Sequence, residues 1–517
     1  MKRISAILTF CLAANSLAYG QEVRGVCGMT VADQAAYTAR LQENLAKVER
    51  GDYVSERGAI QYVPIHFHLV GNADGTGKHK ERLVLDQLCD LNEAYAGTEM
   101  RFYLRPHPTY GLFDKSINNT NVYLNQTNNI LMQNRKHQNA VNVFVVQEPA
   151  TSNDQPGQTL GYYTSLYDWL VIRKSEINGT GNGTLGHEVG HYFSLRHTHY
   201  GWESDPFDPS DAAWPTAPAN SPPSPYGIVP TERMNGTNCT TAADLICDTP
   251  PDYNFGFGWP AGNCIYNLPA KDPLGVQVNP MEDNFMGYFI GCDYVFTPTQ
   301  ENVILVDRAA SYRNYLDNNF VPAATVITTP VDLLVAPTAD DTTQYYDEVL
   351  LEWQSVAGAT YYLLEIDVLN SYSTGNYQSF VLTTTSQLLT NLQENRKYYW
   401  RVRPFNEYAT CAAARAGSFV TSKISDTHEI KVLSAWQIAP NPVSNTARIF
   451  FSAAANFEAT VTIHDATGRR VRTLANTVFP QGESTLGLPV EGLANGLYFV
   501  AIENEEGRAV RKMTIMR

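Results

Sequence analysis

The chain carries three histidines and a glutamate at fixed spacing in the run HEVGHYFSLRH, from His187 to His197. Residues four apart lie on one face of a helix, so His187 and His191 can direct their imidazoles at one metal ion, with Glu188 beside them. A zinc ion held by neutral histidines keeps a position open for water and lowers the pKa of that water towards neutrality. Glu188 can take the proton of this water and return it to a leaving amine. The pattern therefore predicts a zinc site that hydrolyses an amide bond.

His197 lies beyond the reach of the same helix, so the chain must turn sharply near Ser194. This layout resembles the metzincin clan of zinc endopeptidases, whose motif is H-E-x-x-H-x-x-G-x-x-H. The resemblance implies that His197 is the third ligand. Ser194 stands where the clan has glycine; a serine with positive φ costs about 1 kcal/mol, which we interpret as tolerated strain. A lone H-E-x-x-H also occurs on ordinary helices, whereas the extended motif is specific.

The composition limits the classes of protein to which this chain can belong. With 517 residues, 44% hydrophobic and 11% aromatic, the chain is long enough for three or four domains with their own cores. Its net charge of −15 and its lack of a basic stretch argue against nucleic-acid binding. Residues 1–20 are typical of a secretory signal, and no other stretch is apolar for long enough to cross a membrane. We therefore expect an exported protein, secreted or attached to the cell surface, without a transmembrane segment.

Residues 21–57 are expected to form a pro-segment with a charged amphipathic helix from about Ala32 to Glu49. Cys27 precedes this helix, and a thiolate is an excellent zinc ligand. The run from Arg24 to Gly28 resembles the R-x-C-G latency motif of the pappalysin family of metzincins, with one extra residue after the arginine. The resemblance implies that Cys27 displaces the water until the segment is removed. A free or structurally paired cysteine is the alternative.

Residues 58–320 are predicted to form the catalytic domain. Hydrophobic patterns predict strands and one helix before the zinc motif; the strands are 62–70, 140–146, 159–164 and 169–173, and the helix is 81–96. We interpret His66 and His68, on the first strand, as structural, and Thr184 as the N-cap of the zinc helix. The resemblance implies an α+β metzincin fold, with a twisted mixed sheet, the zinc-binding helix and an irregular lower subdomain. It also implies that substrate adds antiparallel to the edge strand 159–164.

The irregular stretch after His197 contains four cysteines, which allow three pairings. They are Cys239, Cys247, Cys264 and Cys292. The segment from Cys247 to Pro250 resembles the C-D-T-P segment of pappalysins. That resemblance implies the pairs Cys239–Cys264 and Cys247–Cys292.

Acidic and carbonyl groups are concentrated between Asp244 and Asp252. Asp244, Asp248 and Thr249 can supply some of the six to eight oxygens that calcium requires. Relatives of the pappalysin family bind calcium, so the resemblance implies a calcium site in this stretch. A solvated loop is the alternative.

The run from Asn284 to Tyr288, NFMGY, resembles the metzincin Met-turn. The resemblance implies that Met286 packs beneath the zinc-binding histidines and that Tyr288 donates a hydrogen bond to the developing oxyanion. Gly287 replaces the aspartate common in this family, and Met281 is a rival for the position under the histidines. Together with the other motifs, the resemblance to pappalysin-type metallopeptidases covers residues 24–320.

The sequence after this turn predicts one more helix and offers one candidate for substrate selection. Thr297, Pro298 and Gln300 form a capping pattern for a helix that runs to about Leu316. Pappalysin relatives often prefer a basic residue beside the scissile bond, and Asp293 is a candidate for such a pocket. The cleavage specificity itself does not follow from the sequence.

The last third of the chain is predicted to form two all-β sandwich domains after a linker at residues 321–339. Residues 340–422 resemble a fibronectin type III domain, in which Cys411 is expected to be unpaired. Residues 429–517 resemble the C-terminal sorting domain of proteins exported by the type IX secretion system. This resemblance implies a two-membrane bacterial host, passage through the periplasm and the secretion machinery as a partner.

The motifs together predict a secreted zinc endopeptidase that is made as a latent zymogen and acts on proteins or peptides. Zinc is expected at His187, His191 and His197, with Glu188 as general base, and calcium is expected as a second ion. The alternative is a surface adhesion or binding protein with a degenerate metal site, in which the fibronectin-like domain binds the partner.

Overall fold

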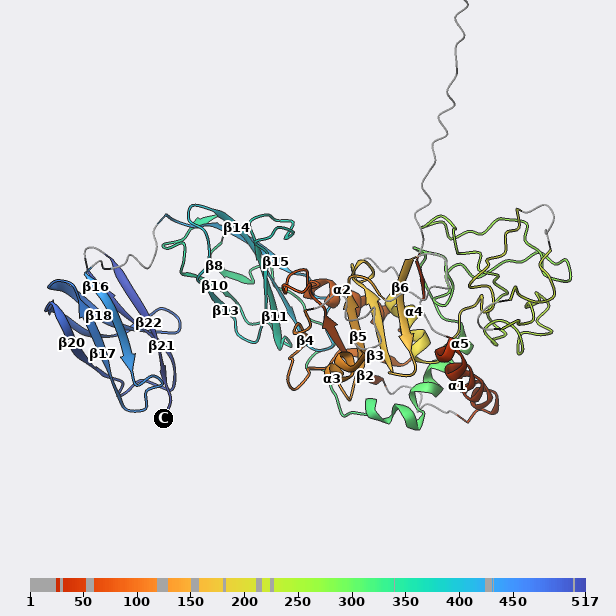
Figure 1. Cartoon of the computed structure of the whole chain (residues 1–517), viewed down its shortest axis with the longest axis horizontal. Coiled ribbons are helices and arrows are strands. Elements are labelled where there is room, and N and C mark those ends of the chain that lie inside the picture. The colour runs from red at the N-terminus through yellow and green to blue at the C-terminus, as the bar shows by residue number, and fades with distance from the viewer. Residues whose placement is uncertain are drawn as a thin grey trace, which may run out of the picture. The chain divides into compact units, whose positions relative to one another are not determined.

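The computed structural model describes residues 25–27, 31–52, 60–118, 129–149, 158–179, 183–210, 216–223, 227–338, 340–423, 430, 432–504 and 507–517. The chain divides into two compact units, Met1–Val321 and Pro322–Arg517 (Figure 1). The first unit combines a mixed sheet with helices and the second is all-β, which confirms the predicted fold class of an α+β unit followed by two all-β sandwiches. The predicted signal, residues 1–20, lies outside the described residues.

The first unit is built on a seven-stranded sheet of order β1-β6-β7-β5-β2-β3, with β4 paired to β2. Its strands are β1 (Gly25–Cys27), β2 (Gln61–Leu69), β3 (Met100–Leu104), β4 (Phe113–Asp114), β5 (Val141–Val146), β6 (Gln158–Thr164) and β7 (Trp169–Arg173). Only β6 and β7 pair antiparallel among these described strands. Every residue of the Val-rich β5 is buried, as expected for a parallel strand covered on both faces. The four strands predicted from the sequence are confirmed.

Five α-helices accompany this sheet in the described part of the first unit: α1 (Val31–Arg50), α2 (Glu81–Ala94), α3 (Asn129–Arg135), α4 (Thr184–Tyr192) and α5 (Pro298–Arg308). The capping box of α5 is confirmed, because Thr297 and Gln300 each bond the other's backbone nitrogen. The predicted length of this helix is wrong, since α5 ends at Arg308 and a separate 3-10 helix, Ser311–Leu316, follows. The break brings Arg313 to Asp307, at a spacing that a continuous helix does not place together.

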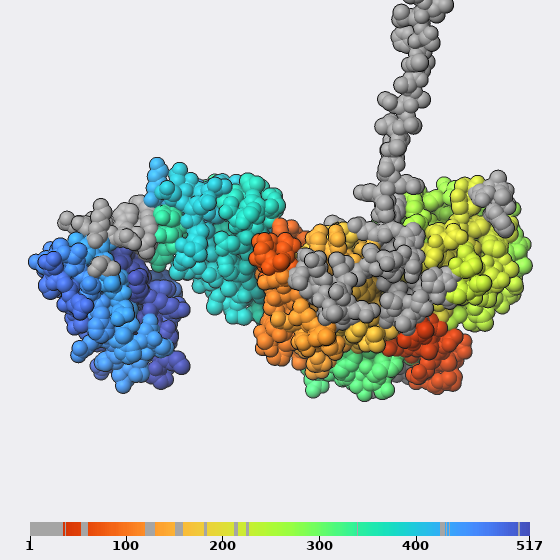
Figure 2. Space-filling view, in the orientation of Figure 1, coloured from red at the N-terminus to blue at the C-terminus, as the bar shows by residue number. Residues whose placement is uncertain are grey.

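The segment between α4 and α5 forms few regular elements, as predicted, but it has an aromatic core of its own. Figure 1 shows this segment as yellow-green loops beside the sheet, and Figure 2 shows the same segment as a yellow-green body. The larger side chains of its core are Trp202, Phe207, Tyr253, Phe255, Tyr266 and Phe289. Side-chain packing therefore stabilises these loops in addition to disulfides.

The disulfides of this segment are Cys239–Cys247 and Cys264–Cys292, so the predicted pairs Cys239–Cys264 and Cys247–Cys292 are wrong. Tight turns between Cys239 and Cys247 bring their Cα atoms within 5.0 Å, which closes a short local loop. The backbone bond from Gly262 N to Ile290 O aligns the chain before Cys264 with the chain before Cys292. Cys411 and Cys89 are also disulfide-bonded. Residues 340–422 contain no other cysteine, so this bond does not contradict the prediction that Cys411 is unpaired within the fibronectin-like domain.

The second unit contains two β-sandwiches. In the first, the sheets β13-β10-β8 and β12-β11-β14-β15-β9 share a core that includes Trp353 and Trp400. Its strands are β8 (Leu334–Ala336), β9 (Asp341–Thr342), β10 (Val349–Trp353), β11 (Tyr361–Asp367), β12 (Gln378–Leu382), β13 (Ser386–Leu389), β14 (Lys397–Phe405) and β15 (Arg415–Val420). Strand β8 and the fully buried Leu333 lie within the segment predicted as a linker, so part of that segment belongs to the sandwich.

The second sandwich pairs the sheets β16-β17-β20 and β19-β18-β21-β22 around Ile449, Val461 and Val500. Its strands are β16 (Leu433–Ala439), β17 (Thr446–Ala453), β18 (Phe457–Asp465), β19 (Arg470–Phe479), β20 (Gly482–Pro489), β21 (Gly496–Glu503) and β22 (Arg508–Ile515). Strand β17 alternates between exposed and buried residues, the pattern of a strand with one face on the core.

Candidate metal centre

Helix α4 carries the first two histidines and the glutamate, and its glycines let it approach the turn beneath it. A Cβ on Gly190 would lie 2.5 Å from the sulfur of Met286, and one on Gly186 would lie 2.7 Å from the ring of Phe285. Contacts this short are not tolerated in a packed interior, so both positions need glycine. Met286 is fully buried, as predicted for the residue under the histidines. The spacing of the two glycines is a sequence signal for this packing face that the motif analysis missed.

The start of α4 differs from the prediction. The N-cap is Gly183, with φ 82°, and Thr184 is the first helical residue. The hydroxyl of Thr184 donates to Glu176 Oε2 at 2.9 Å instead of capping the helix. A Cβ at Gly183 would lie 2.4 Å from the ring of Tyr294, which also favours glycine here.

The sharp turn predicted near Ser194 is present. Helix α4 ends at Tyr192, and Ser194 takes the left-handed conformation with φ 68°. Ser194 N donates to His191 O at 2.9 Å, and Leu195 N donates to Gly190 O at 3.0 Å, which closes the helix end. A serine in this conformation costs about 1 kcal/mol relative to glycine. The turn reverses the chain and returns His197 to the first two histidines.

The three histidines converge through their Nε2 atoms. His191 Nε2 lies 3.1 Å from the Nε2 of His187 and 3.1 Å from that of His197. All three side chains are buried, with exposures of 8%, 0% and 1% for His187, His191 and His197. Their candidate ligand atoms all lie within 4.8 Å of one another. The structure thus brings together the three residues that the sequence predicted as ligands.

The opposite ring nitrogen of each histidine faces an oxygen acceptor. The Nδ1 atoms lie 2.6 Å from Phe285 O for His187, 2.7 Å from Leu195 O for His191 and 3.5 Å from Glu203 Oε1 for His197. A proton on each Nδ1 leaves a lone pair on each Nε2, and three lone pairs in contact repel one another unless a cation lies between them. Burial lowers the pKa of His187 to about 4 and lowers the pKa values of His191 and His197 well below their usual range, which keeps the imidazoles neutral. Three neutral imidazole nitrogens fit zinc.

Two buried carboxylates, Glu203 and Glu188, accompany the three histidines. Glu203 is buried and faces the third ligand, a position that no sequence motif revealed. Glu188 is 1% exposed, and its Oε1 would lie 3.1 Å from a Cβ at Gly161 of β6. Glycine at this point of β6 therefore lets the glutamate lie against the strand.

Tyr288 and His199 surround the third histidine. The hydroxyl of Tyr288 lies 3.5 Å from His197 Nε2. The ring of His199 stacks on that of His197, with centroids 4.7 Å apart. Asp252 Oδ2 lies 3.7 Å from His199 Nδ1 and would lie 3.9 Å from a Cβ at position 287. Asp252 therefore brings a carboxylate near Gly287.

A buried acidic pair lies in the irregular segment. Glu232 is 3% exposed and Asp244 is 1% exposed. Burial raises the pKa of Glu232 to about 10 and that of Asp244 to about 8, and the charge of Asp244 adds to the effect on Glu232. Glu232 Oε2 has no hydrogen-bond partner, whereas Asp244 accepts from Thr249 Oγ1 at 3.0 Å. This pair could hold a cation, which would compensate for the buried charges.

The structure thus brings Asp244 and Thr249 together but gives Asp248 a different position. The carboxylate of Asp248 accepts hydrogen bonds from Thr297 Oγ1 at 2.7 Å and Thr299 N at 2.8 Å. It therefore stabilises the N-terminus of α5, where an anion is favoured by the exposed backbone donors. Sequence reasoning missed Glu232, which has no fixed spacing to the C-D-T-P segment.

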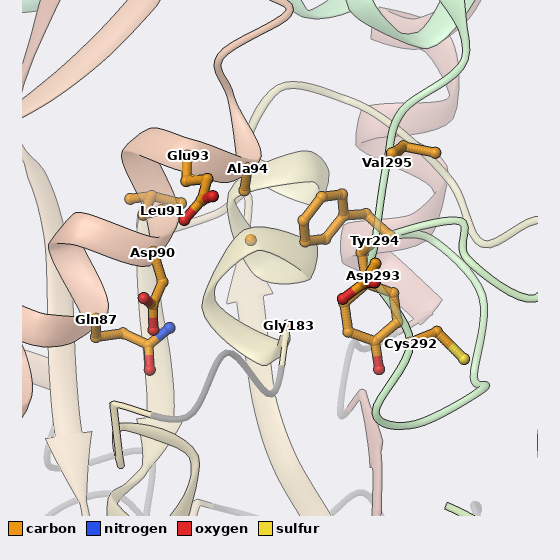
Figure 3. A pocket seen from close by; sticks show the side chains of 12 residues that line it. Gln87, Asp90, Leu91, Glu93, Ala94, Gly183, Cys292, Asp293, Tyr294 and Val295 are labelled. Atoms are coloured by element: carbon orange, nitrogen blue, oxygen red, sulfur yellow. The ribbon is translucent and has the colours of Figure 1, made fainter. Parts of the chain in front are cut away.

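A cavity of about 500 Å³ lies between α2, the start of α4 and residues 292–295 (Figure 3). Its polar lining includes Gln87, Asp90, Glu93 and Asp293. Asp293, the sequence candidate for substrate selection, lines this cavity, whereas the three histidines and Glu188 do not. The position of Asp293 therefore gives it no direct link to the metal centre.

The backbone of Cys27, the predicted latency residue, lies at the edge of the same sheet. Strand β1 pairs parallel with β6, and Cys27 is opposite Gly161. Gly161 is the residue against which Glu188 lies. The side chain of Cys27 is outside the described part of the structure.

The mixed sheet and the three convergent histidines form the candidate metal centre, and parts of the chain are similar to known proteins. Residues 437–516 match the family described as Secretion system C-terminal sorting domain. The "Extracellular metalloprotease" of Colletotrichum graminicola is 23% identical over 256 residues, which cover 46% of this chain and 73% of that protein. A solved Tannerella forsythia promirolysin mutant is 16% identical, with a TM-score of 0.33, and the match covers 56% of this chain and 96% of the other. The solved structure of FN3tt is 22% identical, with a TM-score of 0.16, and covers 19% of this chain and 99% of its own.

The match of residues 437–516 confirms the C-terminal sorting domain that the sequence predicted. The sorting-domain match indicates secretion or attachment to the cell surface. Within the described residues, none of the helices has the length and apolar character needed to cross a bilayer.

Proposed function

We propose that this chain is a secreted zinc endopeptidase that hydrolyses proteins or peptides. The observation that carries the proposal is the convergence of three Nε2 atoms at 3.1 Å next to the buried Glu188. The name of the relative, "Extracellular metalloprotease", supports the same reaction class at 23% identity. The alternative, an adhesion protein with a degenerate metal site, is not favoured because all three ligand positions and their Nδ1 partners are intact.

Each residue of the site has a separate role in hydrolysis. Zinc bound to the three histidines would act as a Lewis acid, lowering the pKa of a water and polarising a peptide carbonyl. Glu188 takes a proton from the attacking water and passes it to the leaving amine. Tyr288 donates a hydrogen bond from its hydroxyl to the oxygen that becomes negative, which stabilises the transition state. Met286 and the backbone acceptors of the Nδ1 atoms keep the imidazoles in place.

A direct test measures hydrolysis of a denatured protein after removal of the pro-segment. The purified chain should cut it, a zinc chelator should abolish cutting, and added zinc should restore it. Cutting that survives full removal of zinc would contradict the proposal.

The pro-segment is proposed to keep the enzyme latent. The parallel pairing of β1 with β6 occupies the sheet edge where an extended substrate would bind, and it places the backbone of Cys27 opposite Gly161. The thiolate of Cys27 is the proposed ligand that blocks the water position. The uncut Cys27→Ala chain should then show activity that the uncut parent chain lacks. Equal latency of the two chains would contradict a role for Cys27.

Calcium is proposed as a second, structural ion, held by Glu232, Asp244 and Thr249. Support comes from two buried carboxylates with raised pKa values and from the unpartnered Glu232 Oε2. Calcium at a hundred times its dissociation constant should stabilise the fold by about 2.7 kcal/mol. Glu232→Gln should abolish the calcium dependence of the melting temperature, and a variant that keeps the full dependence would contradict the assignment.

Export is proposed to use the type IX secretion machinery of a two-membrane bacterium, with passage through the periplasm. The match of residues 437–516 to the sorting-domain family supports this route. Deletion of residues 429–517 should trap the protein inside the cell. Undiminished export of the truncated chain would contradict the proposal.

A further inference from the structure

Helix α1 of the pro-segment is attached to the first unit through a buried amide. Asn44 is fully buried, and its Nδ2 donates to Ser194 Oγ at 3.0 Å and to Asp307 Oδ2 at 2.9 Å. Ser194 and Asp307 are fully buried as well. Because a buried polar group is costly without a partner, these bonds fix the side chain in one position. Asn44 therefore links α1 to the turn of the histidine motif and to α5.

Ser194 needs such support more than a glycine would. It stands between the second and third histidines with φ 68°, a conformation that disfavours any residue with a Cβ. The turn it forms determines where the following residues lie, and His197 is three positions later. A hydrogen bond to the hydroxyl of Ser194 from a fixed donor restrains this turn.

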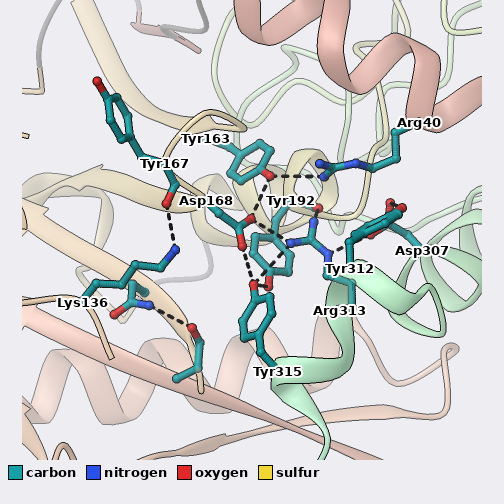
Figure 4. A network of polar contacts seen from close by, with 12 residues as sticks. Arg40, Lys136, Tyr163, Tyr167, Asp168, Tyr192, Asp307, Tyr312, Arg313 and Tyr315 are labelled. Atoms are coloured by element: carbon teal, nitrogen blue, oxygen red, sulfur yellow. Dashed lines mark hydrogen bonds and ion pairs between the residues drawn. The ribbon is translucent and has the colours of Figure 1, made fainter. Parts of the chain in front are cut away.

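The donor is fixed because its second partner belongs to a rigid network (Figure 4). Asp307 also accepts from Arg313 Nε at 3.0 Å and from the hydroxyl of Tyr312 at 2.9 Å. The guanidinium of Arg313 is 1% exposed and donates to Tyr192 O at the end of α4. The network thus holds the last residue of the helix, and Asn44 extends it to the turn that follows.

We propose that Asn44 is a positioning residue for the metal centre, which acts through Ser194 on the turn that carries His197. The pro-segment then supplies, by a hydrogen bond, the restraint that compensates for the missing glycine of the motif. This support exists only while α1 is docked, so the pro-segment assists zinc binding as well as covering the sheet edge. The inference rests on the proposed zinc site but requires no peptidase activity.

The test measures the rate at which zinc passes from the full-length chain to an excess of a coloured chelator. All proteins carry Glu188→Ala so that they cannot cut themselves. Asn44→Ala should release zinc about tenfold faster, the size expected from one lost hydrogen bond between buried groups. When Ser194→Gly is also present, Asn44→Ala should change the rate by less than about twofold, because glycine needs no support. Gln42→Ala, an exposed position of the same helix, is the matched control and should leave the rate unchanged.

Two outcomes would overturn the inference alone. One is an Asn44→Ala chain that releases zinc at the parent rate. The other is an equal acceleration with serine and with glycine at position 194, which would mean that Asn44→Ala acts by general loosening of α1. A chain that binds no zinc in any variant would overturn the proposed function together with this inference.

Discussion

Two groups of buried histidines lie in the first unit, and they differ in where their ring nitrogens point. In the group of His187, His191 and His197, the Nε2 atoms converge at 3.1 Å. The second group consists of the buried His66, His68 and His137 and the half-buried His107, and its neighbouring ring centroids lie between 4.8 and 5.7 Å apart. The rings are close in both groups, so proximity alone does not distinguish them.

Three of the four ring nitrogens of His66 and His68 are engaged elsewhere, and His66 Nε2 has no hydrogen-bond partner. Both ring nitrogens of His68 face acceptors, Asp114 Oδ2 at 2.9 Å and Asn142 Oδ1 at 3.1 Å, and His66 Nδ1 faces Arg105 O. Across the described residues, the first group is the only set of three potential ligands whose atoms gather within 4.8 Å. Convergent lone pairs, rather than the number of histidines, therefore make a metal site.

The largest expected difference between the two groups is the effect on zinc binding of replacing His197 or His68 by alanine. His197→Ala removes one of three ligands and should weaken zinc binding by on the order of a thousandfold. His68→Ala should retain zinc but lower the free energy of unfolding by about 3–5 kcal/mol, because it leaves the buried Asp114 without its partner. Zinc content and denaturant unfolding measure the two effects. A folded His68→Ala chain that has lost its zinc would contradict the claim that the second group does not bind the metal.

A smaller difference in zinc affinity is expected when the carboxylates that face the histidine Nδ1 atoms of the two groups are replaced by amides. Glu203 faces His197 Nδ1 at 3.5 Å, and Asp114 faces His68 Nδ1 at 2.9 Å. Glu203→Gln should weaken zinc binding by about 10- to 100-fold, since an outer carboxylate orients a ligand and raises its basicity. Asp114→Asn is the matched control and should leave the zinc affinity unchanged in a chelator competition. Equal effects of the two substitutions would contradict the assignment of Glu203.

The smallest expected effect is a pH dependence that comes from the second group. Burial lowers the pKa of His137 to about 4, below the usual value near 6.5. The unfolded chain then takes up a proton that the folded chain does not, so stability is lost as the pH falls from about 6.5 to about 4. The melting temperature should fall by several degrees between about pH 7 and pH 5, and His137→Gln should reduce this fall. A melting temperature that does not change with pH would argue against these buried neutral histidines.

The features that the sequence predicts well are local. The helical spacing of His187, Glu188 and His191, the turn at Ser194 and the capping box at Thr297 each depend on residues a few positions apart. Backbone geometry relates such residues directly, because the helix repeat sets which side chains share a face.

The features that the sequence does not predict come from contacts between distant segments. Glu232 and Asn44 have partners that are defined by tertiary packing. Glu203 lies only six residues after His197, but the irregular turn that brings it to this ligand follows no motif. The disulfides illustrate the same limit, because four cysteines allow three pairings and only the folded loops decide between them. The contact between the Asp248 carboxylate and the N-terminus of a helix far along the chain is also one that the sequence does not predict.

The central claim is that three histidines bind zinc while Glu188 moves the proton. The most direct measurement determines zinc content and kcat/KM together for the processed parent chain, Glu188→Ala and His191→Ala. The proposal predicts that Glu188→Ala keeps one zinc per chain but loses at least about a thousandfold in kcat/KM, and that His191→Ala loses both. A zinc-loaded Glu188→Ala chain that cuts at the parent rate would contradict the claim.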